Sequence, residues 1–255
     1  MQLKAKTTLN SYSLVAHLRW HLSSICEMAV AEKIIRANPA TMLYIPKDAK
    51  KGEGRVMTAA DAERALGVGE QRERLMLHLA ILSGLRPGEF LALQRRHVAS
   101  DGSSVIVEQR VYRGDIDVPK NGKTRVVAVP PRTAALLKGW LDAAVASDPD
   151  AWIFASETGK TPMWRDNLLR RYIRPALEKV GLGWVDFKVM RRSNATLGHG
   201  KVDPKVAADQ RGHDIDVSMN VYTKTDIKQR AAVARKLENV VLGPKVVRMP
   251  KRKAS

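Results

Sequence analysis

Two short runs rich in valine and isoleucine, residues 103–112 and 123–130, stand out in a chain whose other apolar residues mostly recur at helical spacing. The runs read SSVIVEQRVY and KTRVVAVP, and β-branched residues bounded by turn signals favour strands. GDID and KNGK between them are rich in turn-forming residues, so we expect the strands to pair as a small antiparallel sheet. The chain is therefore predicted to be mainly α with a small antiparallel β-sheet, an α+β fold.

Helices are predicted on both sides of these strands. They cover residues 72–84, 132–145, 165–181, 188–198, 203–212 and 226–241, with a further helix beginning near Pro87. Thr58 and Asp61 form a capping box, with aspartate in place of the usual Glu or Gln. Asp203 followed by Pro204 predicts an N-cap with proline in the first turn.

The first 47 residues have a pattern of their own. Apolar residues recur at helical spacing between Thr8 and Ile35, and Asn38-Pro39 is expected to end that helix. The polar, charged stretch that follows is typical of a linker. We predict a partial helical domain over residues 1–47, a linker over 48–57, a main domain over 58–243 and a mobile basic tail over 244–255.

Lysine and arginine number 44 against 26 acidic residues, which gives a formal charge of +18. An excess of this size predicts a polyanionic partner, usually nucleic acid, although a ribosome-associated or merely soluble basic protein has the same charge. No apolar run has the length of a membrane helix and the N-terminus lacks the apolar core of a signal peptide, so we expect a cytoplasmic protein without a membrane partner. The single cysteine and the six histidines lack metal-ligand spacing, so we expect no metal and no cofactor.

Three basic residues have settings that suit an anion site, and a fourth, in a turn, indicates nothing by itself. Arg86 lies in SGLRPGE, directly before a helix start, and Lys120 lies in the turn between the two predicted strands. Lys188 and Arg191 are three residues apart and so share one face of a helix, among apolar neighbours. Each also has an ordinary explanation, because a capping arginine, a solvated turn lysine and a basic helix face on solvent are all common.

Two further residues lie near the end of the chain. His213 follows Gly212, where a histidine is more often a helix C-cap than a catalyst. Tyr222 lies nine residues later in NVYTKTD, amid polar neighbours, and a tyrosine in such a setting suits a role for its oxygen rather than its ring.

In this order and spacing the motifs resemble the tyrosine recombinase (phage integrase) family. The family pattern is (S/T)GLRxxE, a lysine on a β-hairpin, HxxR, then GH and a tyrosine nine residues after that histidine. The matching stretches here are SGLRPGE, PKNGKTRVV, KVMR at 188–191, Gly212-His213 and Tyr222. The resemblance runs from about Thr58 to Leu237 and implies the family's catalytic-domain fold, preceded by a shortened core-binding (SAM-like) region over residues 1–47.

The resemblance implies a catalytic set and a reaction. The set is Arg86, Lys120, Lys188, Arg191, His213 and Tyr222. The two arginines would grip the scissile phosphate while the tyrosine attacks it and forms a 3′-phosphotyrosyl ester. The turn lysine would protonate the leaving 5′-hydroxyl, and the histidine and helix lysine would donate hydrogen bonds or assist proton transfer. Because the ester conserves the bond energy, the chemistry requires neither a metal nor ATP.

The resemblance also implies partners. They are double-stranded DNA, a homo-tetramer on paired sites and DNA-bending accessory proteins. By the same analogy, the basic tail or the helix from Asp226 to Val240 would dock on a neighbouring protomer.

Three features depart from the family pattern. Lys188 stands where histidine is usual and Arg192 where a second histidine often follows; lysine is a weaker proton shuttle at neutral pH, so we expect an altered pH dependence. Lys120 is preferred to Lys123 as general acid because of its register relative to the strand. The shortened N-terminal region predicts weak binding to the DNA site, since fewer phosphates are contacted.

Two other functions fit the same residues. A type IB topoisomerase would use the same chemistry without pairing two sites. A non-catalytic DNA-binding remnant of an integrase would need the charge, but it would have no reason to keep the full catalytic set.

Overall fold

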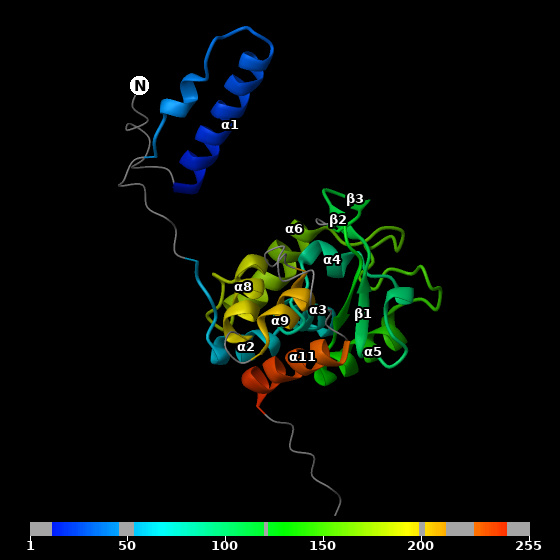
Figure 1. Cartoon of the computed structure of the whole chain (residues 1–255). Coiled ribbons are helices and arrows are strands. Elements are labelled where there is room, and N and C mark those ends of the chain that lie inside the picture. The colour runs from blue at the N-terminus through cyan, green and yellow to red at the C-terminus, as the bar shows by residue number, and fades with distance from the viewer. Residues whose placement is uncertain (1–11, 46–53, 120–121, 199–201, 213–226, 244–255) are drawn as a thin grey trace, which may run out of the picture. The chain divides into compact units, whose positions relative to one another are not determined.

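The structure, a computed structural model, describes residues 12–45, 54–119, 122–198, 202–212 and 227–243. The chain forms two compact units, Met1–Arg55 and Val56–Ser255. Figure 1 shows the helices and strands of each unit. Within the described ranges, no helix combines the length and apolar character needed to cross a membrane.

The first unit contains α1 (Tyr12–Ala31) and the 3₁₀ helix η2 (Pro39–Met42). Helix α1 ends before the predicted stop at Asn38-Pro39. Lys33 takes a left-handed conformation (φ 60°), and the amide of Ile34 donates to the carbonyl of Ala29 at 2.8 Å, which closes the helix. Asn38 instead caps η2, and its Nδ2 donates to the carbonyl of Ser23 at 3.1 Å, so η2 is held against α1.

In its described residues, the second unit is mostly helical and carries four short strands. In chain order its elements are α2 (Ala59–Leu66), α3 (Gln71–Ile81), α4 (Pro87–Leu91), η3 (Arg95–His97), β1 (Ser104–Val107), β2 (Arg110–Tyr112), β3 (Asp115–Asp117), β4 (Arg125–Ala128), α5 (Pro131–Ala144), α6 (Arg165–Leu168), η4 (Leu169–Ile173), α7 (Arg174–Glu178), α8 (Phe187–Gly198), α9 (Pro204–Arg211) and α11 (Ile227–Leu242). The predicted fold class, mainly α with a small antiparallel sheet, is confirmed. The predicted tail over 244–255 lies outside the described residues.

Both helix caps predicted from the sequence are confirmed. Thr58 Oγ1 accepts from the amide of Asp61 at 3.1 Å, and Asp61 Oδ2 accepts from the amide of Thr58 at 3.0 Å. At α9, Asp203 Oδ1 accepts from the amide of Lys205 at 2.8 Å. Each cap satisfies backbone N–H groups that the first helical turn leaves without a partner.

The strands form two separate sheets, whereas the sequence predicted one. β1 and β4 are antiparallel, with Val107 opposite Arg125, while β2 and β3 form a separate two-stranded sheet. The segment GDID, expected to be turn or loop, contains β3. Its side chains are exposed, so it lacks the alternating burial that marks a strand in sequence. Arg113 and Gly114 form its turn with positive φ values of 53° and 96°, the signs of a type I′ hairpin turn.

The single helix predicted over residues 165–181 is divided into three parts. Between α6 and α7 the chain forms a π-helical turn, η4. Pro175, just after this turn, has no N–H to donate to a preceding carbonyl, and its ring clashes with a regular helix. A wider π turn is a usual way to absorb such a break.

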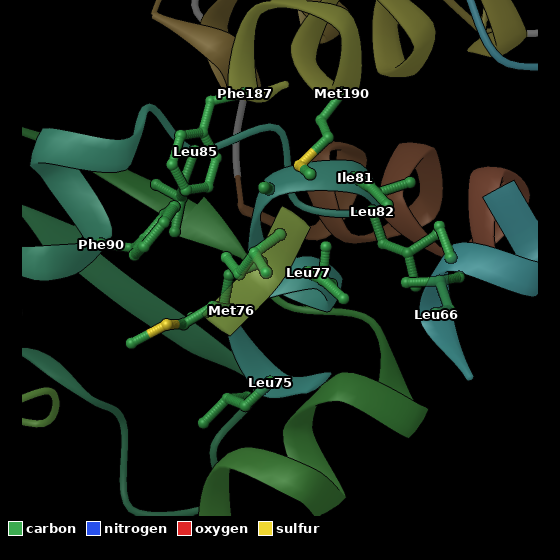
Figure 2. Packing of buried hydrophobic residues seen from close by; sticks show 14 of the residues in the cluster. Leu66, Leu75, Met76, Leu77, Ile81, Leu82, Leu85, Phe90, Phe187 and Met190 are labelled. Carbon is green, nitrogen blue, oxygen red and sulfur yellow. The ribbon is translucent and has the colours of Figure 1, made fainter. Parts of the chain in front are cut away.

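Helix α3 lies at the centre of the core and contacts α2, α4, α5 and α8. Its apolar residues are almost fully buried, including Leu75, Met76, Leu77, Leu79 and Ile81. In Figure 2, Phe187 and Met190 point from α8 into the cluster that holds Leu85 and Phe90. The aromatic rings of Phe90 and Phe187 meet edge to face, with centroids 5.8 Å apart. The core therefore holds α8 against the segment that leads into α4.

Candidate active site

An open pocket of about 490 Å³ lies between α4, β2, α6 and α8. Five cationic side chains and three carboxylates contribute to its lining. The cations are Arg86, Arg110, Arg165, Lys188 and Arg191, and the acids are Glu89, Asp166 and Asp186. Three of the six predicted catalytic residues thus meet at one cavity, where Arg86 joins Lys188 and Arg191 from a distant part of the chain.

Arg86 is the N-cap residue of α4, with Pro87 at the first helical position. The turn before it needs glycine. Gly84 has φ +71°, and a Cβ there would lie 2.9 Å from Asn194 Oδ1 on α8. Asn194 in turn donates to the carbonyls of Ile81 and Leu82 at 2.8 and 3.2 Å, so α8 and the loop before Arg86 are held in close contact.

Glu89 binds both the backbone and the side chain of Arg86. Its Oε2 accepts from the Arg86 amide and its Oε1 from Arg86 Nη1, both at 2.8 Å. Arg86 Nη2 donates to the carbonyl of Gly212 at 3.1 Å. Because α4 has only five residues, the positive charge at this place comes mainly from side chains rather than from the helix N-terminus.

Arg125, at the start of β4, is the second arginine that binds Glu89. Its Nη1 and Nη2 donate to Oε1 and Oε2 of Glu89 at 3.1 and 2.8 Å, and the two side chains are 8% and 2% exposed. Burial alone would raise the pKa of Glu89, but the hydrogen bonds and charge of Arg125, followed by the contacts with Arg86, hold it below its usual value.

Sequence reasoning missed Arg125, although a signal was present. Arg125 is in phase with Val127 and Val129 along the strand, and both valines are buried. Side chains two apart on a strand point to the same face. An arginine in phase with buried valines predicts a buried cation that needs a carboxylate partner.

Arg191 lies on α8, one turn after Lys188. Its Nη1 donates to the carbonyl of Gly84 and its Nη2 to the carbonyl of Arg211, the last residue of α9. Burial, and then the positive charge of Arg86, lower the pKa of Arg191 to about 9. A cation held in this environment is destabilised by its neighbours and would be stabilised by a bound anion.

Helix α9 is attached to β4 through a buried glutamine. Gln210 Oε1 accepts from the amide of Ala128 at 3.0 Å, and its Nε2 donates to the Ala128 carbonyl at 2.7 Å. The helix ends at Gly212 in a left-handed conformation (φ 63°). A Cβ on Gly212 would lie 2.8 Å from Arg125 Cζ, so this backbone lies directly against the guanidinium.

The six predicted site residues divide into two groups. Arg86, Lys188 and Arg191 line the one pocket, with Lys188 exposed at its edge. Lys120, His213 and Tyr222 lie outside the described residues, so their positions stay predictions. In the described ranges, no three His, Cys, Asp or Glu side chains gather as a group able to hold a metal ion.

Solved structures share the fold of this chain. An integrase of the transposon Tn1549, in complex with a circular intermediate DNA, superposes with a TM-score of 0.70 at 18% identity, covering 92% of this chain and 82% of that one. The integrase from mycobacterium phage Brujita gives a TM-score of 0.58 at 20% identity, with 86% and 70% covered. A lambda integrase dimer bound to a COC′ core site gives 0.58 at 18%, with 86% and 84% covered.

Comparison of the amino-acid sequence with known protein families shows which family the chain belongs to. No curated protein matches the chain. The sequence profile of the phage integrase family matches residues 55–229, which is more than half of the chain and includes the pocket and the segment around residue 222. The chain therefore belongs to the phage integrase family.

Proposed function

We propose that the protein is a site-specific DNA recombinase that cleaves and rejoins double-stranded DNA through a covalent 3′-phosphotyrosyl intermediate. The observation that carries this proposal is the convergence of Arg86 and Arg191 with Lys188 on one pocket. Membership of the phage integrase family supports it.

The arginine pair suits a scissile phosphate. A phosphodiester resists attack because the nucleophile meets negative charge, and further charge develops in the pentacoordinate transition state. Guanidinium groups bind such oxygens with two parallel hydrogen bonds and are already oriented here by Glu89, Gly84 and Arg211. Burial, and then the nearby charge of Arg86, lower the pKa of Arg191, so a bound phosphate would stabilise its charged form.

The remaining steps fall to Tyr222, Lys120 and His213, which lie outside the described ranges, and to Lys188. Tyr222 gives its proton to His213 or to water and attacks phosphorus, the bond from phosphorus to the 5′-oxygen breaks, and Lys120 gives that oxygen a proton. His213 and Lys188 donate hydrogen bonds to the phosphate or assist the proton transfers. Reversal of these steps with a different 5′-hydroxyl rejoins the DNA in a new arrangement.

The substrate follows from charge and from related proteins. The formal charge of +18 favours a polyanion. The integrases of Tn1549 and lambda were both solved with DNA. We propose that this protein acts on paired DNA sites as a homo-tetramer, with DNA-bending accessory proteins, in the bacterial cytoplasm where its substrate lies.

Covalent trapping on nicked suicide duplexes tests this function. Because the amino-acid sequence does not reveal which DNA sequence the protein recognises, the duplexes carry a randomised site beside the nick. The wild-type protein is expected to form adducts that resist SDS and are destroyed by protease, and Tyr222→Phe is expected to form none. Equal trapping by the two proteins, or no trapping by either, would refute the proposal.

The other two functions give different results in assays of this kind. A topoisomerase would relax a supercoiled plasmid whether or not the plasmid carries two copies of the DNA site recovered from the trapped duplexes. A DNA-binding remnant would shift the duplex in a gel without a protease-sensitive adduct. A recombinase exchanges strands only when two sites are present.

A further inference from the structure

We propose that Arg125 is a positioning residue for phosphoryl transfer, which holds Arg86 and the end of α9 in their working arrangement. This inference rests on the proposed function, because it assigns Arg125 a part in that reaction. The motifs that mark the site in the sequence do not include it.

The first argument is the geometry around Glu89. Each oxygen of this carboxylate accepts one hydrogen bond from Arg86 and one from Arg125, at distances between 2.8 and 3.1 Å. The Arg125 guanidinium binds both oxygens at once, so it fixes the plane of the carboxylate. Arg86 is then held by a carboxylate whose orientation Arg125 sets.

The second argument is the contact with α9. Gly212 leaves no room for a Cβ against the Arg125 guanidinium, and its carbonyl oxygen accepts from Arg86 Nη2 at 3.1 Å. The chain passes from Gly212 directly to His213, one of the predicted catalytic residues. Arg125 therefore fixes the position of the Gly212 backbone, which directly precedes that histidine.

The third argument is the place of Arg125 in the strand. It opens β4, five positions after the predicted general acid Lys120, and pairs across the sheet with Val107. Its ion pair with Glu89 joins the strand that follows the lysine turn to the segment that carries Arg86. One guanidinium thus connects three parts of the predicted site.

Arg125→Lys and Arg125→Met test this role beside a matched control. Lysine keeps the charge but lacks the planar fork, and methionine keeps much of the volume without charge. Arg72→Lys is the control, because Arg72 pairs with the buried Glu73 (2.6 Å) and lies outside the pocket lining. For each protein we would measure thermal unfolding, the affinity for duplex DNA, and the rate of adduct formation at saturating DNA.

A positioning role predicts a loss of rate without a loss of binding. Adduct formation is expected to slow about tenfold in Arg125→Lys and about a hundredfold in Arg125→Met, which is at most the lower end of the roughly hundredfold to thousandfold loss typical of a group that contacts the reacting atoms directly. Duplex affinity is expected to change less than about twofold, because many phosphate contacts share it. Arg72→Lys should match the wild type in both respects.

Two results would overturn the inference while leaving the proposed function intact. One is a wild-type rate in both Arg125 variants. The other is a parallel fall of rate, DNA affinity and thermal stability in Arg125→Lys, which would show a structural role only. If the wild type forms no Tyr222-dependent adduct, the proposed function fails instead.

A second measurement tests whether Arg125 positions Arg86 and does not depend on DNA cleavage. Inorganic phosphate should raise the unfolding temperature of the wild type and of Arg72→Lys more than that of Arg125→Lys, because the variant holds Arg86 less precisely. Equal shifts in the three proteins would contradict the role of Arg125.

Discussion

At the scale of single residues, the site depends on close contacts between backbone and guanidinium groups. Two glycines of the site have left-handed conformations and close neighbours: a Cβ at Gly84 would meet Asn194 on α8, and a Cβ at Gly212 would meet the Arg125 guanidinium. Arg86 and Arg191 donate to backbone carbonyls as well as lining the pocket. Small changes in the backbone should therefore alter the orientation of the cations.

Gly212→Ala is expected to be more destabilising than Gly181→Ala, although both glycines have positive φ. The two φ values are 63° and 74°, so the left-handed conformation costs each variant about 1 kcal/mol. A Cβ at residue 181 meets nothing within 4 Å, whereas at residue 212 it meets the guanidinium of Arg125. Urea unfolding and the rate of adduct formation measure the difference. Equal effects of the two variants on stability and rate would contradict the contact.

At the scale of elements, features that depend on neighbouring residues could be predicted from the sequence, whereas contacts between distant segments mostly could not. The caps at Thr58 and Asp203 were visible because a cap needs only neighbouring residues. β3 was missed because its pairing is made by backbone groups, with exposed Asp115 and Asp117 at its ends. The meeting of Arg86, Lys188 and Arg191 could be expected only from the family resemblance, and the ion pair of Arg125 with Glu89 depends on a strand and a helix that are distant in sequence.

The contact between α3 and α5 makes stability depend on pH. His78 on α3 lies 3.2 Å from Thr133 Oγ1 on α5, and burial lowers the pKa of this histidine to about 4. Between pH 6.5 and about 4 the unfolded chain binds a proton that the folded chain does not, so stability falls as the pH falls through this window. The expected loss is about 3 kcal/mol, complete near pH 4.

Urea unfolding of the wild type and of His78→Gln between pH 4 and 7 checks this linkage. The variant is expected to lose most of the pH dependence in that window. His17→Gln, a change at an exposed histidine of α1, is the control and should keep the dependence. A wild-type pH dependence in His78→Gln would show that another group is responsible.

At the scale of the whole molecule, the formal charge of +18 sets how the protein meets DNA. Cations that contact phosphates release condensed counterions, so affinity should fall linearly in a plot of log K against log salt, by ~0.9 per phosphate contact. Lys188→Gln removes an exposed cation at the pocket and is expected to reduce that slope by about 1. Fluorescence anisotropy with a duplex between 50 and 300 mM salt measures it.

The control for the salt experiment is Lys138→Gln on α5, a helix that packs against α3 and does not line the pocket. Its slope should equal that of the wild type. An unchanged slope in Lys188→Gln would remove this lysine from the DNA contact surface.

The most direct test of the account is to identify the residue that carries the nucleotide after cleavage. Trapped adducts are digested with nuclease and trypsin, and the peptides are examined by mass spectrometry. The account predicts a nucleotide mass on the tryptic peptide of residues 212–224, located at Tyr222. A nucleotide attached to another residue, or adducts that persist in Tyr222→Phe, would contradict it.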